Sequence, residues 1–174
     1  MIGRDYGLRP KGVPVYLLLK TVHVLSVILF LGNIITGLFW KAHADATRDP
    51  RLQAHALAGI IRSDNWFTIP SVLLIIITGV ALAMWAGLSL LGTQWIAISL
   101  AAFLISGLLF VIFLGPQQKQ LLAMAREAEA GTVPEWPSAA YRRLSTRWEV
   151  IGLIAIALPL VALALMVFKP ASIF

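Results

Sequence analysis

Four apolar stretches constrain this chain more than any other feature of its sequence. Each is long enough to cross about 30 Å of hydrocarbon as an α-helix, and they cover residues 15–40, 67–87, 93–114 and 150–168. A helix satisfies its own backbone hydrogen bonds, which lipid cannot do. The sequence therefore predicts an all-α polytopic membrane protein, a four-helix transmembrane bundle that forms a single membrane domain over residues 1–174.

Composition and charge narrow the function classes. Hydrophobic residues make up 59% of the chain and charged residues only 13%, and there is no cysteine. The lack of cysteine excludes disulfides, thiolate metal sites, iron–sulfur ligation and cysteine nucleophiles. The net charge of +6 comes from basic residues at the ends of the apolar stretches. We therefore expect a lipid bilayer, and no nucleic acid, as the surroundings of this chain.

Basic residues are distributed unequally between the two sides of the predicted bundle. The second connection has none, and the side that it shares with the termini carries only Arg4, Arg9, Lys11 and Lys169. By the positive-inside rule, the first and third connections lie in the cytoplasm and both termini lie on the other side. The basic residues of these two connections are Lys41, Arg48, Arg51, Arg62, Lys119, Arg126, Arg142, Arg143 and Arg147.

Several local signals extend the helices beyond the apolar stretches. Asp49-Pro50 predicts the start of a short interfacial helix, and Pro116 predicts a kink in a third helix that continues to Gly131. The fourth helix is predicted to start early, near Ser138. Pro159 lies inside that helix and frees a backbone carbonyl for a structural contact or a pocket. At the cytoplasmic boundary we expect ion pairs among Arg62, Asp64, Arg147 and Glu149.

The first stretch contains the two ionisable residues that lie well inside a predicted span, Lys20 and His23. Intramembrane ionisable groups are rare and are functional hypotheses by default. A neutral imidazole at position 23 offers one nitrogen to a haem iron or a copper ion, while Ser26 or a carbonyl accepts from the other. Lys20, one turn outward, would then pair with a haem propionate. The plainer alternatives are a hydrogen bond from His23 between helices and a Lys20 side chain that reaches the headgroups.

Two methionines and a stripe of small residues are weaker candidates for the same site. Met84 and Met166 share the outer half of the bundle with His23, and methionine can ligate haem iron or copper(I), although it is also ordinary filler in membrane helices. Gly79, beside Thr78 on the second helix, permits close helix packing or gives clearance to a flat porphyrin. Ser99 and Ser106 share a face of the third helix and predict close packing.

Short motifs along most of the chain resemble an uncharacterised bacterial family of predicted integral membrane proteins, domain of unknown function 2269. The motifs are Leu19-Lys20-Thr21-Val22-His23-Val24-Leu25-Ser26 with Phe30-Leu31-Gly32, Arg62 to Pro70 with Ile77-Thr78-Gly79, Arg147-Trp148-Glu149, and Met166-Val167-Phe168-Lys169-Pro170. This resemblance implies a multi-pass protein of the bacterial inner membrane. In that membrane, the orientation given by the positive-inside rule puts both termini in the periplasm.

The first-helix motif also resembles that of HemJ-type protoporphyrinogen IX oxidases and, more faintly, the membrane domain of CopD-type copper-resistance proteins. His23 matches the haem-binding histidine of the oxidases. The second and third helices lack the lysine of the oxidase pattern, and its later histidines are missing. The resemblance therefore implies haem b binding through His23 rather than porphyrinogen oxidation.

The sequence as a whole favours a bundle that binds one b-type haem in its outer half and has a redox, gas-sensing or oxygen-chemistry role. The residues that would bind the cofactor are His23, Lys20, Ser26 and Gly79. The second face of the haem would be ligated by Met84, Met166 or water, or would stay open. Two alternatives stay open: a copper-handling transporter that uses His23, Met84 and Met166, and a cofactor-free accessory subunit of a larger membrane complex. Whether the chain is an enzyme also stays open, as do a quinone or other membrane redox partner and a homo-oligomer.

Overall fold

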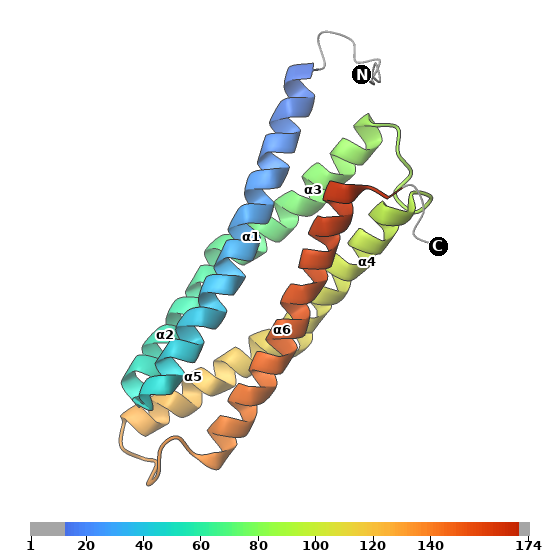
Figure 1. Ribbon diagram of the computed structural model, residues 1–174. Helices are drawn as coiled ribbons and strands as arrows, with labels where there is room; N and C mark the ends of the chain where they lie inside the picture. Colours follow the sequence, from blue (N-terminus) through green and yellow to red (C-terminus); the bar gives the residue numbers. More distant parts are fainter. Residues whose placement is uncertain (1–12, 171–174) are drawn as a thin grey trace.

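The computed structural model describes residues 13–170 and consists of long helices arranged as an antiparallel bundle (Figure 1). Four of its helical rods are long and apolar enough to cross a membrane. The rods are α1 (Val13–Thr47), α2 (Pro50–Ser63) continued through η1 (Asp64–Thr68) into α3 (Ile69–Trp85), α4 (Gln94–Leu109) continued through η2 (Phe110–Leu114) into α5 (Gly115–Glu129), and α6 (Ala139–Phe168). Residues 13–170 contain no strand, so the predicted all-α four-helix membrane bundle is confirmed.

Two segments of π-helix, η1 and η2, interrupt the second and third rods just before prolines. Each ends two residues before a proline, Pro70 or Pro116. Proline has no N–H to donate and crowds the carbonyl four residues earlier, and a wider turn accommodates this within a continuous helix. The predicted helix at Asp49-Pro50 is therefore not a separate interfacial element, because it runs through η1 into the membrane-crossing α3.

The ends of the helices follow the local signals in the sequence. The Asp49 carboxylate accepts from the backbone N–H of Arg51 at the start of α2, and the Ser138 hydroxyl accepts from that of Tyr141 at the start of α6. Beyond the end of α5, Gly131 has a φ of +74°, a conformation that glycine adopts without strain. These boundaries were predictable because each depends on one or two residues next to the helix.

The rods pack in pairs rather than around a single central core. The membrane-crossing part of α1 packs against α3, α4 packs against α6, and α2 packs against α5. One cluster of buried side chains, which includes Leu57, Leu121 and Trp148, joins α2, α5 and α6. A second, with Phe30, Ile75 and Ile156, joins α1, α3 and α6. The α1–α3 pair carries His23, and the α1–α6 junction carries the charged residues described below.

Pro159 shows how the α4–α6 pair closes. Its ring removes the hydrogen bond that the carbonyl of Ala155 would accept within α6. The hydroxyl of Ser106 on α4 donates to this carbonyl at 2.6 Å. The freed carbonyl is therefore part of the contact between α4 and α6. The sequence left open a structural contact or a pocket for this carbonyl, and the structure shows the structural contact.

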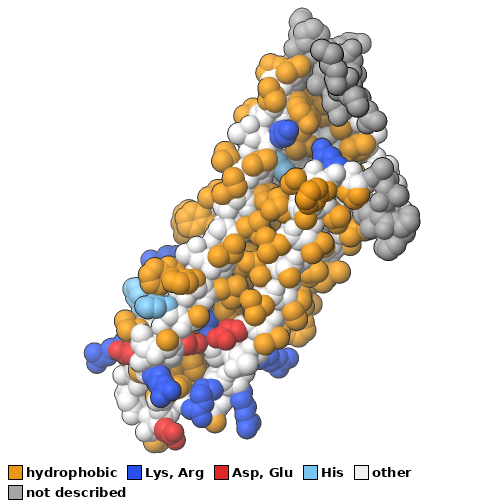
Figure 2. Space-filling view, in the orientation of Figure 1, with side chains coloured by type: hydrophobic (Ala, Val, Ile, Leu, Met, Phe, Trp, Pro, Cys, Tyr) orange, Lys and Arg blue, Asp and Glu red, His pale blue; other side chains and the backbone are white. Residues whose placement is uncertain are grey.

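Charged side chains gather at one end of the bundle, which we call the basic end (Figure 2). It comprises the last turns of α1, α2, α5 and the first turns of α6. The opposite end, where α1 begins and α6 ends, is mainly apolar over the described residues and carries Lys20 and Lys169. Arg4, Arg9 and Lys11, which the sequence predicts at this end, lie outside the described residues.

Candidate functional site

His23 lies on α1 at the face that packs against α3. Its imidazole is half-buried, and its Nδ1 lies 2.9 Å from the hydroxyl oxygen of Thr78 on α3. Gly79 lets the ring approach α3 this closely, because a Cβ at position 79 would lie only 3.2 Å from Cε1 of His23.

The hydrogen bonds of Thr78 fix the tautomer of a neutral His23. The Thr78 hydroxyl lies 2.5 Å from the backbone carbonyl of Leu74, which can only accept, so the hydroxyl proton is committed to that bond. Thr78 must therefore accept from Nδ1–H of His23. The lone pair of the neutral imidazole is then on Nε2, the nitrogen available to a metal or a proton.

The structure brings one of the other predicted site residues into contact with His23 and leaves the rest apart. Gly79 packs against the ring. The Ser26 hydroxyl donates to the carbonyl of Val22 within α1, so the partner of His23 is Thr78 and not Ser26. Lys20 is exposed. Met84 is 72% exposed and lies six residues beyond Thr78, about 120° around α3 from the face that meets α1.

Met166 lies half-buried on α6, the helix that pairs with α4 rather than with α3. Residues 13–170 contain no group of three or more His, Asp or Glu side chains arranged to hold a metal ion. The donor set that the described residues offer at His23 is therefore a single imidazole with a fixed orientation.

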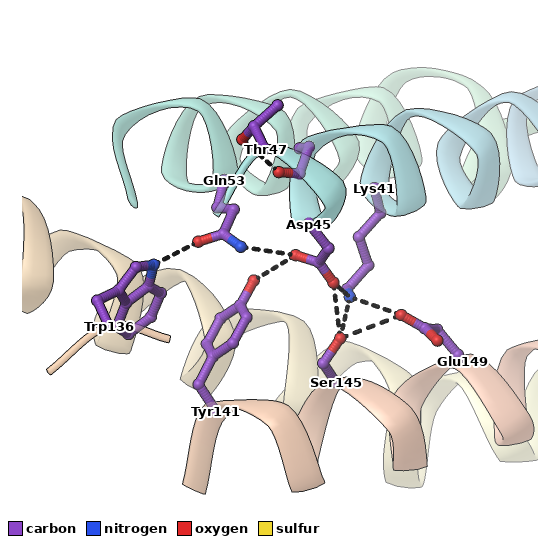
Figure 3. A network of polar contacts seen from close by, with 9 residues as sticks. Lys41, Asp45, Thr47, Gln53, Trp136, Tyr141, Ser145 and Glu149 are labelled. Atoms are coloured by element: carbon purple, nitrogen blue, oxygen red, sulfur yellow. Dashed lines mark hydrogen bonds and ion pairs between the residues drawn. The ribbon is translucent and has the colours of Figure 1, made fainter. Parts of the chain in front are cut away.

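A second polar site, at the basic end, is built around Lys41 (Figure 3). The Lys41 side chain is only 1% exposed, and its ammonium lies between α1 and α6. It contacts the Asp45 carboxylate at 2.5 Å, the Ser145 hydroxyl at 2.5 Å and the Glu149 carboxylate at 3.2 Å. These three contacts match the three N–H donors of the ammonium, so the buried charge is fully hydrogen-bonded.

Asp45 extends the contacts of Lys41 to Tyr141 on α6, to α2 and to the α5–α6 connection. Its carboxylate also accepts from the Tyr141 hydroxyl at 2.8 Å and from the Gln53 amide at 3.2 Å. The Gln53 carbonyl in turn accepts from the indole N–H of Trp136 at 2.7 Å. This network fastens the end of α1 to α2, α6 and the α5–α6 connection (Figure 3).

A third polar group surrounds Asp64 in η1. Its carboxylate accepts from Asn33 on α1 at 3.1 Å, from Thr68 at 2.8 Å and from Gln118 on α5 at 3.0 Å. Among residues 13–170, no lysine or arginine lies within ion-pair distance of it. The expected pairing of Arg62, Asp64, Arg147 and Glu149 is therefore wrong: Glu149 pairs with Lys41, and neutral donors satisfy Asp64.

The sequence contained a signal for Lys41 that the limits of the predicted span concealed. At 100° per residue, His23, Asn33 and Gly37 fall on one polar stripe of the first helix. Lipid would not select such a face, so the stripe predicts that these residues point into the bundle. Continued by one helical turn it reaches Lys41, and by another Asp45. The apolar stretch ends at position 40, so Lys41 counted only as a basic residue of the first connection, although α1 continues to Thr47.

Comparisons with known proteins place the chain in a family without assigning an activity. No curated protein and no solved structure matches it. The family model described as "Predicted integral membrane protein (DUF2269)" matches residues 17–170. This range includes the first membrane-crossing rod from residue 17 onward and the other three completely. The protein belongs to the DUF2269 family of predicted integral membrane proteins.

Proposed function

We propose that this protein binds one b-type haem through Nε2 of His23 and has a redox or oxygen-chemistry role in the membrane. The observation that carries the proposal is the chain of hydrogen bonds from His23 through Thr78 to the carbonyl of Leu74. Metal-ligating histidines commonly donate their other N–H to a neighbouring acceptor, which fixes the tautomer and the ring plane. His23 meets this requirement within the bundle.

The donor set at His23 suits haem better than a free copper ion. One imidazole is enough to hold haem iron on its proximal side. A copper site draws on several nitrogen or sulfur donors. With Met84 pointing away from α1 and no cluster of other metal-binding side chains among the described residues, the haem proposal needs fewer changes to the bundle than the copper alternative.

The chain's own residues would position the ligand and tune its basicity. Thr78 would hold Nδ1–H and Gly79 would let the ring lie against α3, while Ser26 is engaged within its own helix. The exposed Lys20, one turn from His23, is free to turn toward an anionic propionate. Bound haem would supply one-electron or oxygen chemistry. A quinone or another membrane redox partner would exchange the electrons.

The test is the visible spectrum of the protein purified in mild detergent, oxidised and then reduced with dithionite. A Soret band with reduced α and β bands, lost in His23→Ala, is expected. His43→Ala and His55→Ala are the matched controls, because both side chains are exposed and lie at the basic end. These two variants should keep the spectrum of the unaltered protein.

Other outcomes would identify the alternatives. Folded protein without a Soret band after haem supplementation would overturn the haem proposal. Copper in the purified protein, lost in His23→Ala, would then favour the copper-handling transporter. Neither cofactor, together with a co-purifying membrane complex, would favour the accessory subunit.

We also propose that the basic end lies in the cytoplasm and that α1 begins and α6 ends on the periplasmic side of the inner membrane. The asymmetry of basic residues supports this orientation. Because the chain has no cysteine, single cysteines at Thr132 and Leu91 report on opposite connections. A membrane-impermeant maleimide added to intact spheroplasts should label Leu91→Cys and not Thr132→Cys, and the reverse pattern would overturn the proposed orientation.

A further inference from the structure

A shallow groove of about 610 Å³ lies on the outside of α6 at the basic end. Arg143, Arg147 and Val150 follow one another at helical spacing on this face. The buried face of the same turns carries Tyr141, Ser145 and Trp148, so the groove faces away from the bundle. The lining residues are Arg142, Arg143, Thr146, Arg147, Val150 and Ile151.

The three arginines of this groove have little to neutralise them within the described chain. Arg142 donates to the backbone carbonyl of Pro137 at 2.5 Å, whereas Arg143 and Arg147 have no hydrogen bond or ion pair with any residue in 13–170. No acidic side chain lines the groove. Glu149, the nearest acid along the helix, is engaged by Lys41. The groove therefore presents concentrated positive charge without an internal partner.

The position of the groove determines which anion suits it. Val150 and Ile151 form its apolar part, and beyond them the exposed side chains of α6, such as Leu153 and Ile154, are apolar. This surface of α6 therefore changes from positively charged to apolar within two helical turns. An anionic phospholipid has the same order of groups, a phosphate followed by acyl chains.

We propose that this groove binds the headgroup of an anionic phospholipid, with the phosphate between Arg143 and Arg147 and an acyl chain along Val150 and Ile151. Guanidinium groups bind phosphate oxygens in a bidentate manner, which gives specificity beyond diffuse attraction to the bilayer surface. Free phosphate would use the arginines and leave the apolar part of the groove uncovered. The site is separate from His23 and does not depend on haem.

The test measures lipid selectivity at the surface of the full-length protein. Protein is reconstituted into phosphatidylcholine vesicles with a minority of phosphatidylglycerol, and acyl-chain spin labels report the association constant of each lipid by electron spin resonance. The unaltered protein should prefer phosphatidylglycerol. Arg142→Gln/Arg143→Gln/Arg147→Gln should lower that preference at least about fivefold, the typical effect of a single basic residue at an anionic surface.

A charge-matched control separates a site from a general surface effect. Arg51→Gln/Arg62→Gln/Arg126→Gln removes the same charge from exposed positions at the same end of the bundle. It should lower the preference less than the groove variant does, because it removes only the diffuse attraction of basic residues to anionic lipid. An equal loss in both triple variants, or no loss in either, would overturn the proposal. Release of the labelled lipid by inorganic phosphate, but not by sodium chloride of equal ionic strength, would show a soluble-anion site and would also overturn it.

The single variant Arg143→Gln guards against misfolding as an explanation, since this exposed side chain has no partner in the described structure. Circular dichroism and gel filtration should match those of the unaltered protein. Its preference for phosphatidylglycerol should still fall, and an unchanged preference would count against the groove.

Discussion

Replacing Lys41 with methionine removes the most buried charge of the network at the basic end and keeps most of the side-chain volume. Removing one partner of a fully buried ion pair costs about 3–5 kcal/mol, whereas exposed pairs contribute about 0–1 kcal/mol. Lys41 is 1% exposed, but the carboxylate side chains that it contacts are 20% (Asp45) and 42% (Glu149) exposed. We therefore expect a loss between these limits.

The remaining hydrogen bonds set the size of that loss. Without Lys41, Asp45 keeps the Tyr141 hydroxyl and the Gln53 amide as donors, and Glu149 can turn to water. The free energy of unfolding should fall by about 2–3 kcal/mol, close to the value of one or two hydrogen bonds to charged groups. Reversible unfolding in mixed detergent and dodecyl sulfate micelles measures this change.

A matched control and double-mutant cycles test whether the loss of stability comes from the buried contacts of Lys41. Lys119→Met removes an exposed lysine at the same end and should change stability by no more than about 0.5 kcal/mol. The coupling of Lys41 to Asp45 in a cycle with Asp45→Asn should exceed its coupling to Glu149 in a cycle with Glu149→Gln, because the first contact is shorter and less exposed. A Lys41→Met variant as stable as the Lys119→Met control would refute the argument.

Three further predictions concern the contacts between helices. Thr78→Val leaves Nδ1–H of His23 without its hydroxyl acceptor and should weaken haem binding about 10–100-fold in a haem titration, with Thr78→Ser retaining most of the affinity. Ser106→Ala leaves the buried carbonyl of Ala155 without its donor and should lower the free energy of unfolding by about 1 kcal/mol; a change within error in dodecyl sulfate unfolding would contradict this. Gly79→Ala places a Cβ 3.2 Å from the His23 ring and should shift the Soret or α band without abolishing it, so an unaltered spectrum would show that the ring does not depend on this contact.

The local features of the fold were predictable because neighbouring residues determine them. The caps at Asp49 and Ser138 and the terminating Gly131 each depend on backbone groups a few residues away. Four apolar rods follow in the same way from the lengths of the apolar stretches. The sequence did not predict the backbone geometry at the prolines. A π-helical turn before Pro116 and a sharp kink at it have the same sequence signal, a proline inside a helical stretch.

The polar sites were only partly predictable. The helical stripe correctly directed His23 and Asn33 into the bundle, but their partners Thr78 and Asp64 come from another rod, 55 and 31 residues away. A periodic pattern on one helix does not specify which donor or acceptor on the next helix lies at the same depth. The same limitation led to the wrong ion pairs at the basic end, where Glu149 meets Lys41 and not an arginine.

By itself, the sequence determined that this chain forms membrane-crossing helices, because lipid requires each long apolar segment to satisfy its own backbone. It also determined which end of the bundle is basic. The tertiary structure alone decided that Thr78 orients His23, that Ser106 satisfies the carbonyl freed by Pro159, and that Lys41 is buried between two carboxylates. These contacts depend on the depth and rotation at which separate rods meet, and a hydrogen bond a few ångströms long is made or lost with a small change in either.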